Sequence, residues 1–420
     1  MTISKAEYFD KLTCRLCKSP ELRLVLNLGE TFLADEFTSI DNIGDPDSKF
    51  PLAVNICRAC GWIQTSIVVN PKRLYQMDYP YDSSITKTGQ LHWAELASAS
   101  RQFFFEREDL RSLDIGANVG SLVKEFENLG FEAFGVDPSD TATKIANSFD
   151  LRVENAFFDF ALAMEWSQDG RLFDVITATN VFAHVDDLDG WLNGILLLLK
   201  NKGILIIEVP HVLNLILQNQ FDTIYHEHLS YVSIKPLIAY LNKFGLEIFK
   251  IEEKAIHGGS IRIYVGRLMD YEIENSVQEI ITKESACGVD ELKSLQDFEK
   301  RVFETILTFQ DFIQKSIELG KSIVAVSAPA KGMTFLNVVG LQSPSLTAIS
   351  DAATQKIGKY APGTGVRVVS DEDLAVLEPD IVIVLAWNFA EEIINKIKSK
   401  FGKETTFITA IPRLKEFKNA

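Results

Sequence analysis

The segment Leu113-Asp-Ile-Gly-Ala-Asn-Val-Gly120 decides the fold, because it joins an apolar strand to a helix through a glycine-rich turn. Glycines let the backbone pass close to a ligand, and the first turn of the helix supplies free amides. A second acidic residue, Asp137, follows the next apolar strand, where a carboxylate can hydrogen-bond both hydroxyls of a ribose. The two segments together predict a site for a nucleotide-like cofactor.

Strand-like and helical patterns alternate around this turn, over residues 73–300. Helical patterns fill most of the gaps between the apolar runs, for example at 122–129 and 188–200. This alternation predicts a mostly parallel sheet that is covered by helices on both faces. Strands are expected at residues 111–115, 133–136, 173–178, 204–208 and 260–265.

The last part of the chain, residues 301–420, repeats this pattern on a smaller scale. A long amphipathic helix at about residues 289–319 is expected to join the two α/β units. The fold class is therefore α/β, with a larger central unit and a smaller C-terminal one. Strands of the smaller unit are expected at residues 322–326, 346–350, 381–385 and 406–408.

The first 72 residues contain two cysteine pairs, Cys14-x-x-Cys17 and Cys57-x-x-Cys60. Two pairs placed at turns in a large chain point to metal rather than to disulfides, and four thiolates suit tetrahedral Zn²⁺. Four protein ligands leave no open position for chemistry, so we expect a structural zinc domain over residues 1–72. Buried free cysteines are the alternative.

Composition excludes several classes of protein. The formal net charge of −16 argues against sequence-independent nucleic-acid binding, which needs a basic face. No segment approaches the roughly 18 continuous apolar residues of a membrane helix, and the N-terminus lacks an apolar stretch of signal-peptide length. We therefore expect a cytoplasmic protein with no membrane or nucleic-acid partner. Nothing in the sequence demands a partner protein, and a monomer is the default expectation.

The most reactive segment is Tyr225-His-Glu-His-Leu-Ser-Tyr231, which places two imidazoles, a carboxylate and two phenols within seven residues. Such a set can take a proton from carbon and hold the anion left behind. Upstream, Asn180 and His184 follow another strand, and side chains at this strand end face the ligand cleft of an open α/β sheet. Further along, Ser327-Ala-Pro-Ala-Lys331-Gly332 lies between a strand and a helix and resembles an anion site, with a solvated lysine as the alternative.

The glycine turn and the acidic strand end resemble those of class I S-adenosylmethionine (SAM)-dependent methyltransferases. An NAD site is the alternative, but the turn lacks the Gly-x-Gly-x-x-Gly spacing of dinucleotide enzymes. By this resemblance Asp137 holds the adenosine ribose, and Asp114 lines the methionine end of the cofactor. Phe157 and Phe158 flank the adenine, unless they are simply core residues. The expected cofactor site thus consists of Asp114, Gly116, Asn118, Gly120, Asp137, Phe157, Phe158 and Asn180.

The order of motifs along nearly the whole chain resembles that of the C-methyltransferases of nucleotide-linked deoxysugars. The matching motifs are the cysteine pairs, Tyr79-Pro-Tyr81-Asp-Ser-Ser, Asn180-Val-Phe-x-His184, the Tyr225–Tyr231 segment, His257-Gly-Gly-Ser260, Ala328-Pro-Ala-Lys-Gly332, Pro362-Gly-Thr and Ala386-Trp-Asn388. The resemblance implies a class I methyltransferase core with an N-terminal zinc-binding domain and a C-terminal Rossmann-like domain, over residues 1–72, 73–300 and 301–420. The last of these is expected to bind the nucleotide of the substrate.

The same resemblance assigns roles to individual side chains. His228 is expected to be the base, Glu227 orients a group or bonds the sugar, and Tyr79 and Tyr225 contact the sugar or its enolate. His226 is expected to be outward or structural. The substrate-binding residues are expected to be His184, Tyr81, Lys331 and Ser327.

The expected reaction is therefore C-methylation of a nucleotide-linked 4-keto-deoxysugar, at the carbon next to the ketone and most simply C3. The ketone acidifies the neighbouring C–H, a histidine base removes the proton, and the enolate attacks the SAM methyl group. O- or N-methylation of a sugar or another small metabolite is the alternative. A zinc-stabilised scaffold that only binds SAM is a third possibility, although Asp114, Asp137 and His228 are all intact.

The third domain departs from the family pattern at three places. Asp351 usually begins Asp-x-Asn-Pro-x-Lys, whereas here the segment is Asp-Ala-Ala-Thr-Gln-Lys356. Gly365 stands where a histidine commonly follows Pro-Gly-Thr, and Met333 stands where asparagine often follows Lys-Gly. These changes leave room for a different nucleotide carrier, or for an acceptor that is not a nucleotide sugar.

Overall fold

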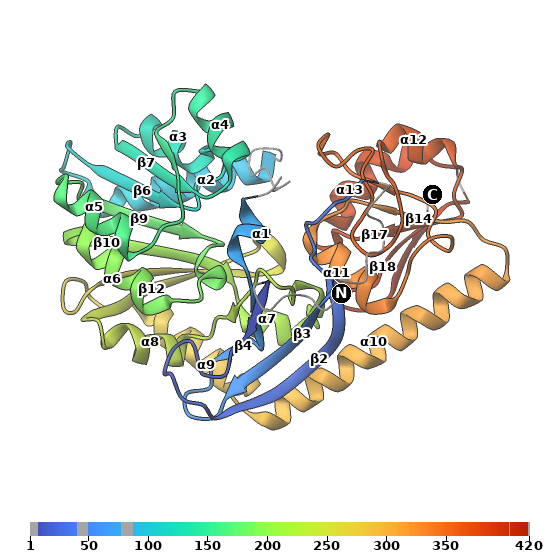
Figure 1. Cartoon of the computed structure of the whole chain (residues 1–420), viewed down its shortest axis with the longest axis horizontal. Helices are drawn as coiled ribbons and strands as arrows, with labels where there is room; N and C mark the ends of the chain where they lie inside the picture. The colour runs from blue at the N-terminus through green and yellow to red at the C-terminus, as the bar shows by residue number, and fades with distance from the viewer. Residues whose placement is uncertain (1–6, 40–48, 77–86, 403, 419–420) are drawn as a thin grey trace.

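The computed structural model describes residues 7–39, 49–76, 87–402 and 404–418 (Figure 1). Its N-terminal part contains a four-stranded antiparallel sheet in the order β11-β4-β3-β2 and a two-stranded ribbon of β1 and β5. The strand β11 comes from much further along the chain than its neighbours. The bounds are β1 Tyr8–Asp10, β2 Leu22–Phe32, β3 Lys49–Cys57, β4 Ile63–Thr65, β5 Ile67–Val69 and β11 Ser230–Tyr231, with α1 at Pro71–Tyr75.

A seven-stranded sheet in the order β12-β13-β10-β9-β6-β7-β8 forms the centre of the molecule. The five strands from β10 to β8 run parallel, and β13 and β12 add antiparallel strands beside β10. This agrees with the mostly parallel sheet expected from the sequence. The bounds are β6 Arg111–Ile115, β7 Glu132–Asp137, β8 Val153–Asn155, β9 Phe173–Thr179, β10 Leu199–Pro210, β12 Leu246–Lys254 and β13 Ser260–Arg267.

Helices cover both faces of this sheet, because successive side chains of a buried strand point to opposite sides. In β9, Ile176 packs in one hydrophobic cluster with α5, α6, α8 and α9, whereas its neighbour Val175 packs in another with α2, α3 and α4. Both residues are fully buried. The bounds are α2 Lys87–Arg101, α3 Ser121–Asn128, α4 Asp140–Ser148, α5 Phe160–Gln168, α6 Leu188–Leu198, α7 Val212–Leu217, α8 Ile234–Asn242 and α9 Asn275–Cys287.

The C-terminal part contains a six-stranded sheet in the order β16-β15-β14-β17-β18-β19, parallel except for the β18–β19 pair. Ala325 packs toward α10 and α11, and its neighbour Val324 packs toward α12 and α13. The bounds are β14 Ile323–Val326, α11 Ala330–Val339, β15 Ile349–Ser350, β16 Val368–Val369, α12 Asp371–Val376, β17 Ile381–Val384, α13 Ala390–Ile397, β18 Thr406–Thr409 and β19 Lys415–Lys418.

The helix α10 (Leu292–Glu318) runs along the molecule from the central unit to the C-terminal one (Figure 1). Its 27 residues make it about 40 Å long. Its buried side chains recur every three or four positions, as expected for an amphipathic helix, and they join a core shared with the N-terminal sheet and α11. The predicted domain boundary between residues 300 and 301 falls inside this continuous helix.

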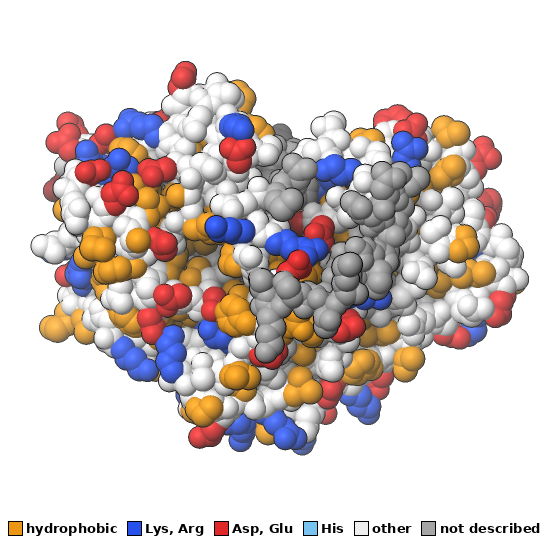
Figure 2. Space-filling model, in the orientation of Figure 1, with side chains coloured by type: hydrophobic (Ala, Val, Ile, Leu, Met, Phe, Trp, Pro, Cys, Tyr) orange, Lys and Arg blue, Asp and Glu red, His pale blue; other side chains and the backbone are white. Residues whose placement is uncertain are grey.

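One predicted strand is shorter than expected. Only Ile349 and Ser350 of residues 346–350 form β15, because the amide of Leu346 is held in a turn by the carbonyl of Gln342. Among the described residues, no helix is long and apolar enough to cross a membrane. Figure 2 shows Lys and Arg side chains interspersed with Asp and Glu over the visible face.

Candidate functional site

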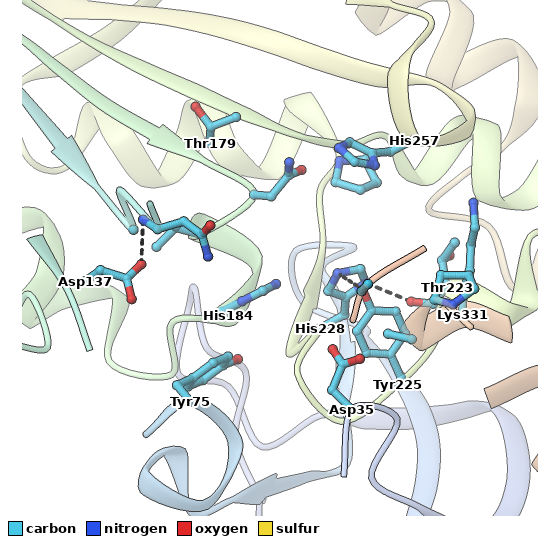
Figure 3. A pocket seen from close by; sticks show the side chains of 18 of the residues that line it. Asp35, Tyr75, Asp137, Thr179, His184, Thr223, Tyr225, His228, His257 and Lys331 are labelled. Carbon is cyan, nitrogen blue, oxygen red and sulfur yellow. Dashed lines mark hydrogen bonds between the residues drawn. The ribbon is translucent and has the colours of Figure 1, made fainter. Parts of the chain in front are cut away.

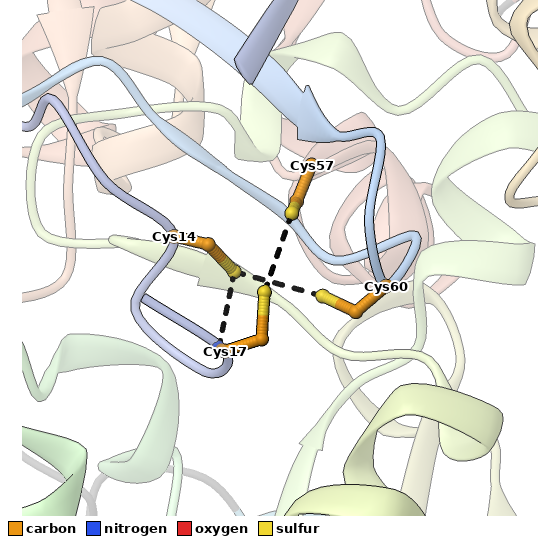
Figure 4. A group of neighbouring side chains, drawn as sticks. All are labelled: Cys14, Cys17, Cys57 and Cys60. Carbon is orange, nitrogen blue, oxygen red and sulfur yellow. Dashed lines mark hydrogen bonds between the residues drawn. The ribbon is translucent and has the colours of Figure 1, made fainter. Parts of the chain in front are cut away.

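The four paired cysteines of the N-terminal part converge on one point (Figure 4). Their sulfur atoms all lie within 4.8 Å of one another. The sulfurs of Cys14 and Cys60 are 3.6 Å apart, and those of Cys17 and Cys57 are 3.5 Å apart. A tetrahedron with Zn–S bonds of about 2.3 Å has S···S edges of about 3.8 Å, so the donor set and its spacing fit a structural Zn²⁺.

Both cysteine pairs sit in the same kind of turn. The amide of Lys18 donates to the carbonyl of Cys14, and the amide of Gly61 donates to that of Cys57. Lys18 and Gly61 both have a left-handed backbone, with φ of 64° and 83°. The two turns thus present their thiols in matching geometry, which is expected of paired zinc knuckles.

The zinc-binding part also holds the reactive segment in place. The segment Tyr225–Tyr231 ends in β11, where Ser230 pairs with Gln64 and Tyr231 with Ile63 in β4, just beyond Cys60. The amide of Thr65 donates to the carbonyl of Leu229 at 3.0 Å. The local structure of the reactive segment therefore depends on a sheet that begins at the cysteine cluster.

A cavity of about 950 Å³ lies where the carboxyl ends of the two parallel sheets face each other (Figure 3). This volume is at the upper end of the usual range for small-molecule sites. Its walls include residues at the carboxyl ends of strands of both sheets, or within two positions after them, as expected for ligand sites in open α/β folds. From the central sheet these are Gly116, Asp137 and Asn180, and from the C-terminal sheet Ser327, Asp351 and Ala386.

Two carboxylates, Asp114 and Asp137, mark the half of the cavity that the sequence predicts for the cofactor. The Oδ2 atom of Asp137 accepts the amide of Asn118 at 2.9 Å, and its Oδ1 accepts the amide of Ser139 at 2.8 Å. Burial raises the pKa of Asp137, and these two bonds oppose the shift. Burial also raises the pKa of Asp114 to about 7, although the Thr177 hydroxyl donates to its Oδ1 at 2.7 Å.

The glycines of the turn serve two different purposes. Gly116 lines the cavity with φ of 76°, and a Cβ at this position would lie 2.2 Å from Cγ2 of Val181. Gly120 caps α3 with φ of 80°, and its missing side chain makes room for Leu151. Gly116 thus keeps the turn open toward the ligand, whereas Gly120 allows the helix to pack. Asn118 also lines the cavity and has φ of 51°.

The other predicted cofactor residues also lie on this wall. Phe157 and Phe158 both line the cavity. The Phe158 ring packs against Trp191, with ring centroids 6.4 Å apart, so this side chain is also part of the core. Asn180 lines the cavity in a left-handed conformation, and its amide donates to the carbonyl of Glu208 at 2.7 Å.

The reactive half centres on Tyr225 and His228. The Nδ1 atom of His228 lies 2.8 Å from the carbonyl oxygen of Thr223, which can only accept, so Nδ1 carries the proton. The Nε2 atom lies 2.8 Å from the Tyr225 hydroxyl and must accept from it while the ring is neutral. Burial lowers the pKa of His228 to about 4, with the Thr223 bond opposing the shift, and burial raises that of Tyr225 well above its usual value.

The neighbours of His228 in the sequence face elsewhere. His226 is buried and its Nε2 lies 3.2 Å from the carbonyl of Pro51, a structural position rather than an outward one. Glu227 is buried, and its Oε2 has no hydrogen-bond partner among the described residues. Burial raises the pKa of Glu227 to about 8, so the side chain is a neutral acid near pH 7. Tyr231 packs in the core.

A second imidazole, that of His184, lies beside this pair. Its ring centroid is 5.2 Å from that of His228, and the Tyr75 ring stacks on it at 5.7 Å with an interplanar angle of 12°. Its Nε2 has no hydrogen-bond partner among the described residues. Burial and then the neighbouring His228 lower the pKa of His184, so a neutral ring lines the cavity with an unused nitrogen.

The C-terminal wall repeats the arrangement around Asp137. Asp351 follows β15, its Oδ2 accepts the amide of Ala328 at 2.6 Å, and its Oδ1 accepts the amide of Ala353 at 2.8 Å. Ser327, at the turn after β14, has φ of 66°. Ser327, Asp351 and Ala353 all line the cavity.

Lys331 lines the cavity at the start of α11, but it is not a freely solvated lysine. Its ammonium contacts the side-chain oxygen of Asn388 and lies 4.7 Å from the centre of the Trp387 ring. Trp387 in turn donates to Asp222 at 2.7 Å. Burial lowers the pKa of Lys331 to about 8, and the nearby Asp222 opposes this shift. The cluster joins the C-terminal unit to the central one.

Several cavity residues were not predicted from the sequence. Asp35, Tyr75 and Thr223 carry no motif that could have identified them, because distant segments bring them to the cavity. His257 belongs to the His-Gly-Gly-Ser motif between two strands, and Asp351 directly follows a strand, so the sequence held a signal for both. The predicted residues Tyr79 and Tyr81 lie outside the part of the chain that the structure describes.

Three family models match the chain. A zinc binding domain matches residues 14–75, a methyltransferase domain matches residues 90–251, and the C-methyltransferase C-terminal domain matches residues 255–412. The third match begins before α10, between the last two strands of the central sheet. The three matches follow one another along nearly the whole chain.

Individual proteins are similar over different shares of the chain. C-methyltransferase NovU of Streptomyces niveus is 29% identical over 400 residues, which is 95% of each chain. A ubiquinone biosynthesis O-methyltransferase of Rhodopseudomonas palustris (strain TIE-1) is 36% identical over 103 residues, 24% of this chain and 40% of that one. The solved structure of the plantazolicin methyltransferase BpumL in complex with SAH is 13% identical with a TM-score of 0.35, over 43% of this chain and 85% of that one.

Proposed function

The chain is a SAM-dependent C-methyltransferase with an N-terminal zinc-binding domain, and we propose that its acceptor is a nucleotide-linked 4-keto-deoxysugar. Methylation takes place at the carbon next to the ketone, C3, after a base has removed the proton from that carbon. The observation that carries the proposal is the tautomer of His228, because it leaves an unprotonated nitrogen inside the cavity.

The His228 ring is suited to act as the base. The Thr223 carbonyl fixes the proton on Nδ1, and the Nε2 lone pair is available once the Tyr225 hydroxyl moves aside. A neutral imidazole at neutral pH can accept the proton of an acidified C–H. The displaced Tyr225 hydroxyl then hydrogen-bonds the sugar. We assign Glu227, as a buried neutral acid, to the orientation of this segment.

The cofactor and the acceptor can meet in this cavity. We assign Asp137 to the ribose of SAM, and Asp114 and Gly116 to its methionine end, on the wall opposite the C-terminal sheet. A methyl group held there can be attacked in line by the carbanion, and holding both reactants in one site supplies much of the rate enhancement. We assign His184, with its unused Nε2, to the sugar.

We assign the nucleotide to the C-terminal unit, over residues 301–420. The support is that Asp351 accepts the amides of Ala328 and Ala353 just as Asp137 accepts those of Asn118 and Ser139. An acidic residue after the second strand of a βαβ unit is the usual place for a pentose hydroxyl. Ser327 and Lys331, at the adjacent helix start, then face the diphosphate. The Lys331 ammonium and the amides at the start of α11 suit such an anion.

The proposal is tested by a mass-spectrometric methylation assay with SAM and a panel of TDP-, GDP-, CDP- and UDP-linked 4-keto-6-deoxysugars. We expect one panel member to gain a methyl group on carbon. We also expect solvent deuterium to enter that acceptor at C3 in the presence of the enzyme. Methyl transfer to oxygen or nitrogen, without exchange at carbon, would instead establish O- or N-methylation. No product from any panel member, with SAM binding confirmed by calorimetry, would reject the acceptor class.

A further inference from the structure

The turn between β12 and β13 carries a histidine in an unusual backbone conformation. His257 has φ of 56° and ψ of 22°, and Gly258 and Gly259 follow with φ of 88° and 114°. Non-glycine residues in this region are uncommon, and the strain persists only where the surroundings enforce it. Such positions cluster at functional sites, so the contacts that hold this turn are informative.

Two side-chain amides hold the backbone of the turn. The carbonyl of Gly258 accepts the side-chain amide of Gln220 at 2.6 Å, and that of Gly259 accepts the side-chain amide of Asn214 at 3.1 Å. A Cβ on Gly258 would lie 2.8 Å from the Trp387 ring, and one on Gly259 would lie 2.3 Å from Asn214. The two glycines therefore let the turn pack closely against three side chains, and His257 is left to project from it.

The His257 ring lines the cavity, half-buried (Figure 3). Among the described residues, no hydrogen bond to this ring is found, whereas His228 uses both nitrogens and Lys331 contacts Asn388. Burial, followed by the nearby Lys331, lowers the pKa of His257 to about 4, so the ring is neutral and has one N–H to donate. In the view of Figure 3, His257 lies above His228.

The proposed enolate chemistry needs a group of this kind. The base must approach along the C–H bond, perpendicular to the plane of the carbonyl, whereas a donor to the carbonyl oxygen must lie near that plane. One side chain does not serve both purposes, so the ketone oxygen needs a donor other than His228. A neutral imidazole can donate to a developing enolate oxygen, and removal of such a donor costs about 10²–10³ in kcat.

We propose that His257 is a catalytic residue that donates a hydrogen bond to the ketone oxygen of the acceptor as negative charge develops on it. The proton of the carbon acid passes to Nε2 of His228, the electron pair moves onto the oxygen held by His257, and the enolate carbon then displaces S-adenosylhomocysteine from the methyl group. His257 keeps its proton throughout. This inference rests on the proposed function, because O- or N-methylation forms no enolate.

The test compares wild type with His257→Gly, which removes the imidazole and tolerates the left-handed backbone. With the panel member that the wild type methylates, we expect kcat of the variant to fall by about 10²–10³ and the SAM Kd, measured by calorimetry, to stay within about twofold. Deuterium exchange at C3 should fall in parallel. Added imidazole should restore part of kcat to His257→Gly and none to His228→Asn.

The outcomes separate the inference from the proposed function. An active wild type with a His257→Gly variant that keeps kcat within about threefold would overturn the inference alone. A variant whose loss lies in SAM affinity would place His257 at the cofactor and overturn it as well. A wild type that methylates no panel member would overturn the proposed function and the inference together. His257→Asn, which also tolerates the left-handed backbone, checks that any loss is not caused by glycine flexibility.

Discussion

The hydroxyl of Tyr225 lies 2.8 Å from Nε2 of His228, and the two ring centroids are 4.0 Å apart. This contact determines which nitrogen of the histidine is available, because the other nitrogen donates to Thr223. In the free protein the tyrosine therefore occupies the lone pair that the proposed reaction needs. When the acceptor binds, its acidic C–H has to replace the Tyr225 hydroxyl at Nε2 of His228. Substitutions of Tyr225 and of His228 should therefore have different effects.

We expect His228→Asn to abolish methyl transfer, since no base remains, and Tyr225→Phe to reduce kcat only about tenfold to a hundredfold. The pKa of His228 is lowered to about 4, so its basic, neutral form dominates above that pH. The wild-type kcat/KM should thus rise with pH through about 4 and stay level from about 5 upward on its acidic side. A pH profile of kcat/KM, with SAM binding measured for each variant, checks this. A fall in kcat/KM below about pH 6.5 would show that His228 keeps the ordinary pKa of a solvated histidine in the active enzyme.

The sequence could identify which residues line the part of the cavity assigned to the cofactor, because the signals for these residues are local. Asp114, Gly116 and Asp137 belong to short segments in which one strand is followed directly by a turn. The pairing of β11 with β4 could not be predicted, since it joins residues such as Ser230 and Gln64 that are far apart in the chain and are brought together by the zinc-binding turns.

For the reactive half, the sequence indicated which types of residue are present but not how they are arranged. The segment Tyr225–Tyr231 identified the residue types, whereas the tautomer of His228 depends on a carbonyl at Thr223 that has no side-chain signal. The roles of Asp222 and Trp387 depend on how two sheets face each other. The turn at His257 depends on packing against Asn214 and Trp387, which no pattern near residue 257 reveals.

Glu227 should make stability depend on pH. Burial raises its pKa in the folded protein to about 8, above the ordinary value of 4.5, so between these values the folded state binds more protons than the unfolded state. The contribution of Glu227 to the free energy of unfolding is therefore fully present below about pH 4.5 and is lost as pH rises through about 8. We expect Glu227→Gln to be more stable than wild type by on the order of 4 kcal/mol at pH 8, and by less than about 1 kcal/mol at pH 5.

Thermal or urea unfolding at pH 5 and pH 8 measures this difference. The buried Asp114, with a pKa of about 7, also titrates in this range, so only the difference between the two proteins reports on Glu227. Glu165→Gln, in an exposed position on α5, is the matched control and should leave the pH profile unchanged. Equal stability of Glu227→Gln and wild type at both pH values would contradict the prediction.

SAM binding should need a glycine at position 116 because any side chain there would clash with Val181, and not only because the backbone is left-handed. A Cβ at Gly116 would lie 2.2 Å from Val181, whereas Gly130, with a similar φ of 83°, has open space around it. Both alanine variants carry the same backbone strain, so a comparison isolates the contact. We expect Gly116→Ala to raise the SAM Kd at least about tenfold, a cost of about 1.4 kcal/mol, and Gly130→Ala to leave it unchanged. Calorimetry measures the SAM Kd of both variants. Equal Kd values would show that the contact with Val181 does not matter for SAM binding.

Asp137 and Asp351 should separate the two proposed ligands. Each carboxylate accepts two backbone amides, and each lies at the carboxyl end of a parallel strand, Asp137 as the last residue of β7 and Asp351 directly after β15. A hydrogen bond to a charged group contributes about 1.5–3 kcal/mol, so its loss should weaken binding about tenfold or more. We expect Asp137→Asn to weaken SAM and spare nucleoside diphosphates, and Asp351→Asn to do the reverse.

Titration of both variants with SAM, TDP, UDP, GDP and CDP checks this crossed pattern. The wild type should bind at least one of the diphosphates. If Asp351→Asn weakens none of them while Asp137→Asn weakens SAM, the C-terminal carboxylate serves the fold and does not hold a pentose.

The cysteine cluster should control activity as well as stability, although it lies outside the cavity. Cys57 provides one of four sulfurs spaced for Zn²⁺, and the sheet that starts beside it pairs with β11 at the end of the reactive segment. Cys57→Ser should lose zinc, lower the free energy of unfolding by several kcal/mol, and reduce kcat because His228 is no longer held. Zinc content by mass spectrometry, thermal unfolding and the methylation assay measure the three effects. Cys287→Ser, at a cysteine outside the cluster, should change none of them. Full activity in a zinc-free Cys57→Ser protein would show that the reactive segment keeps its shape without the metal.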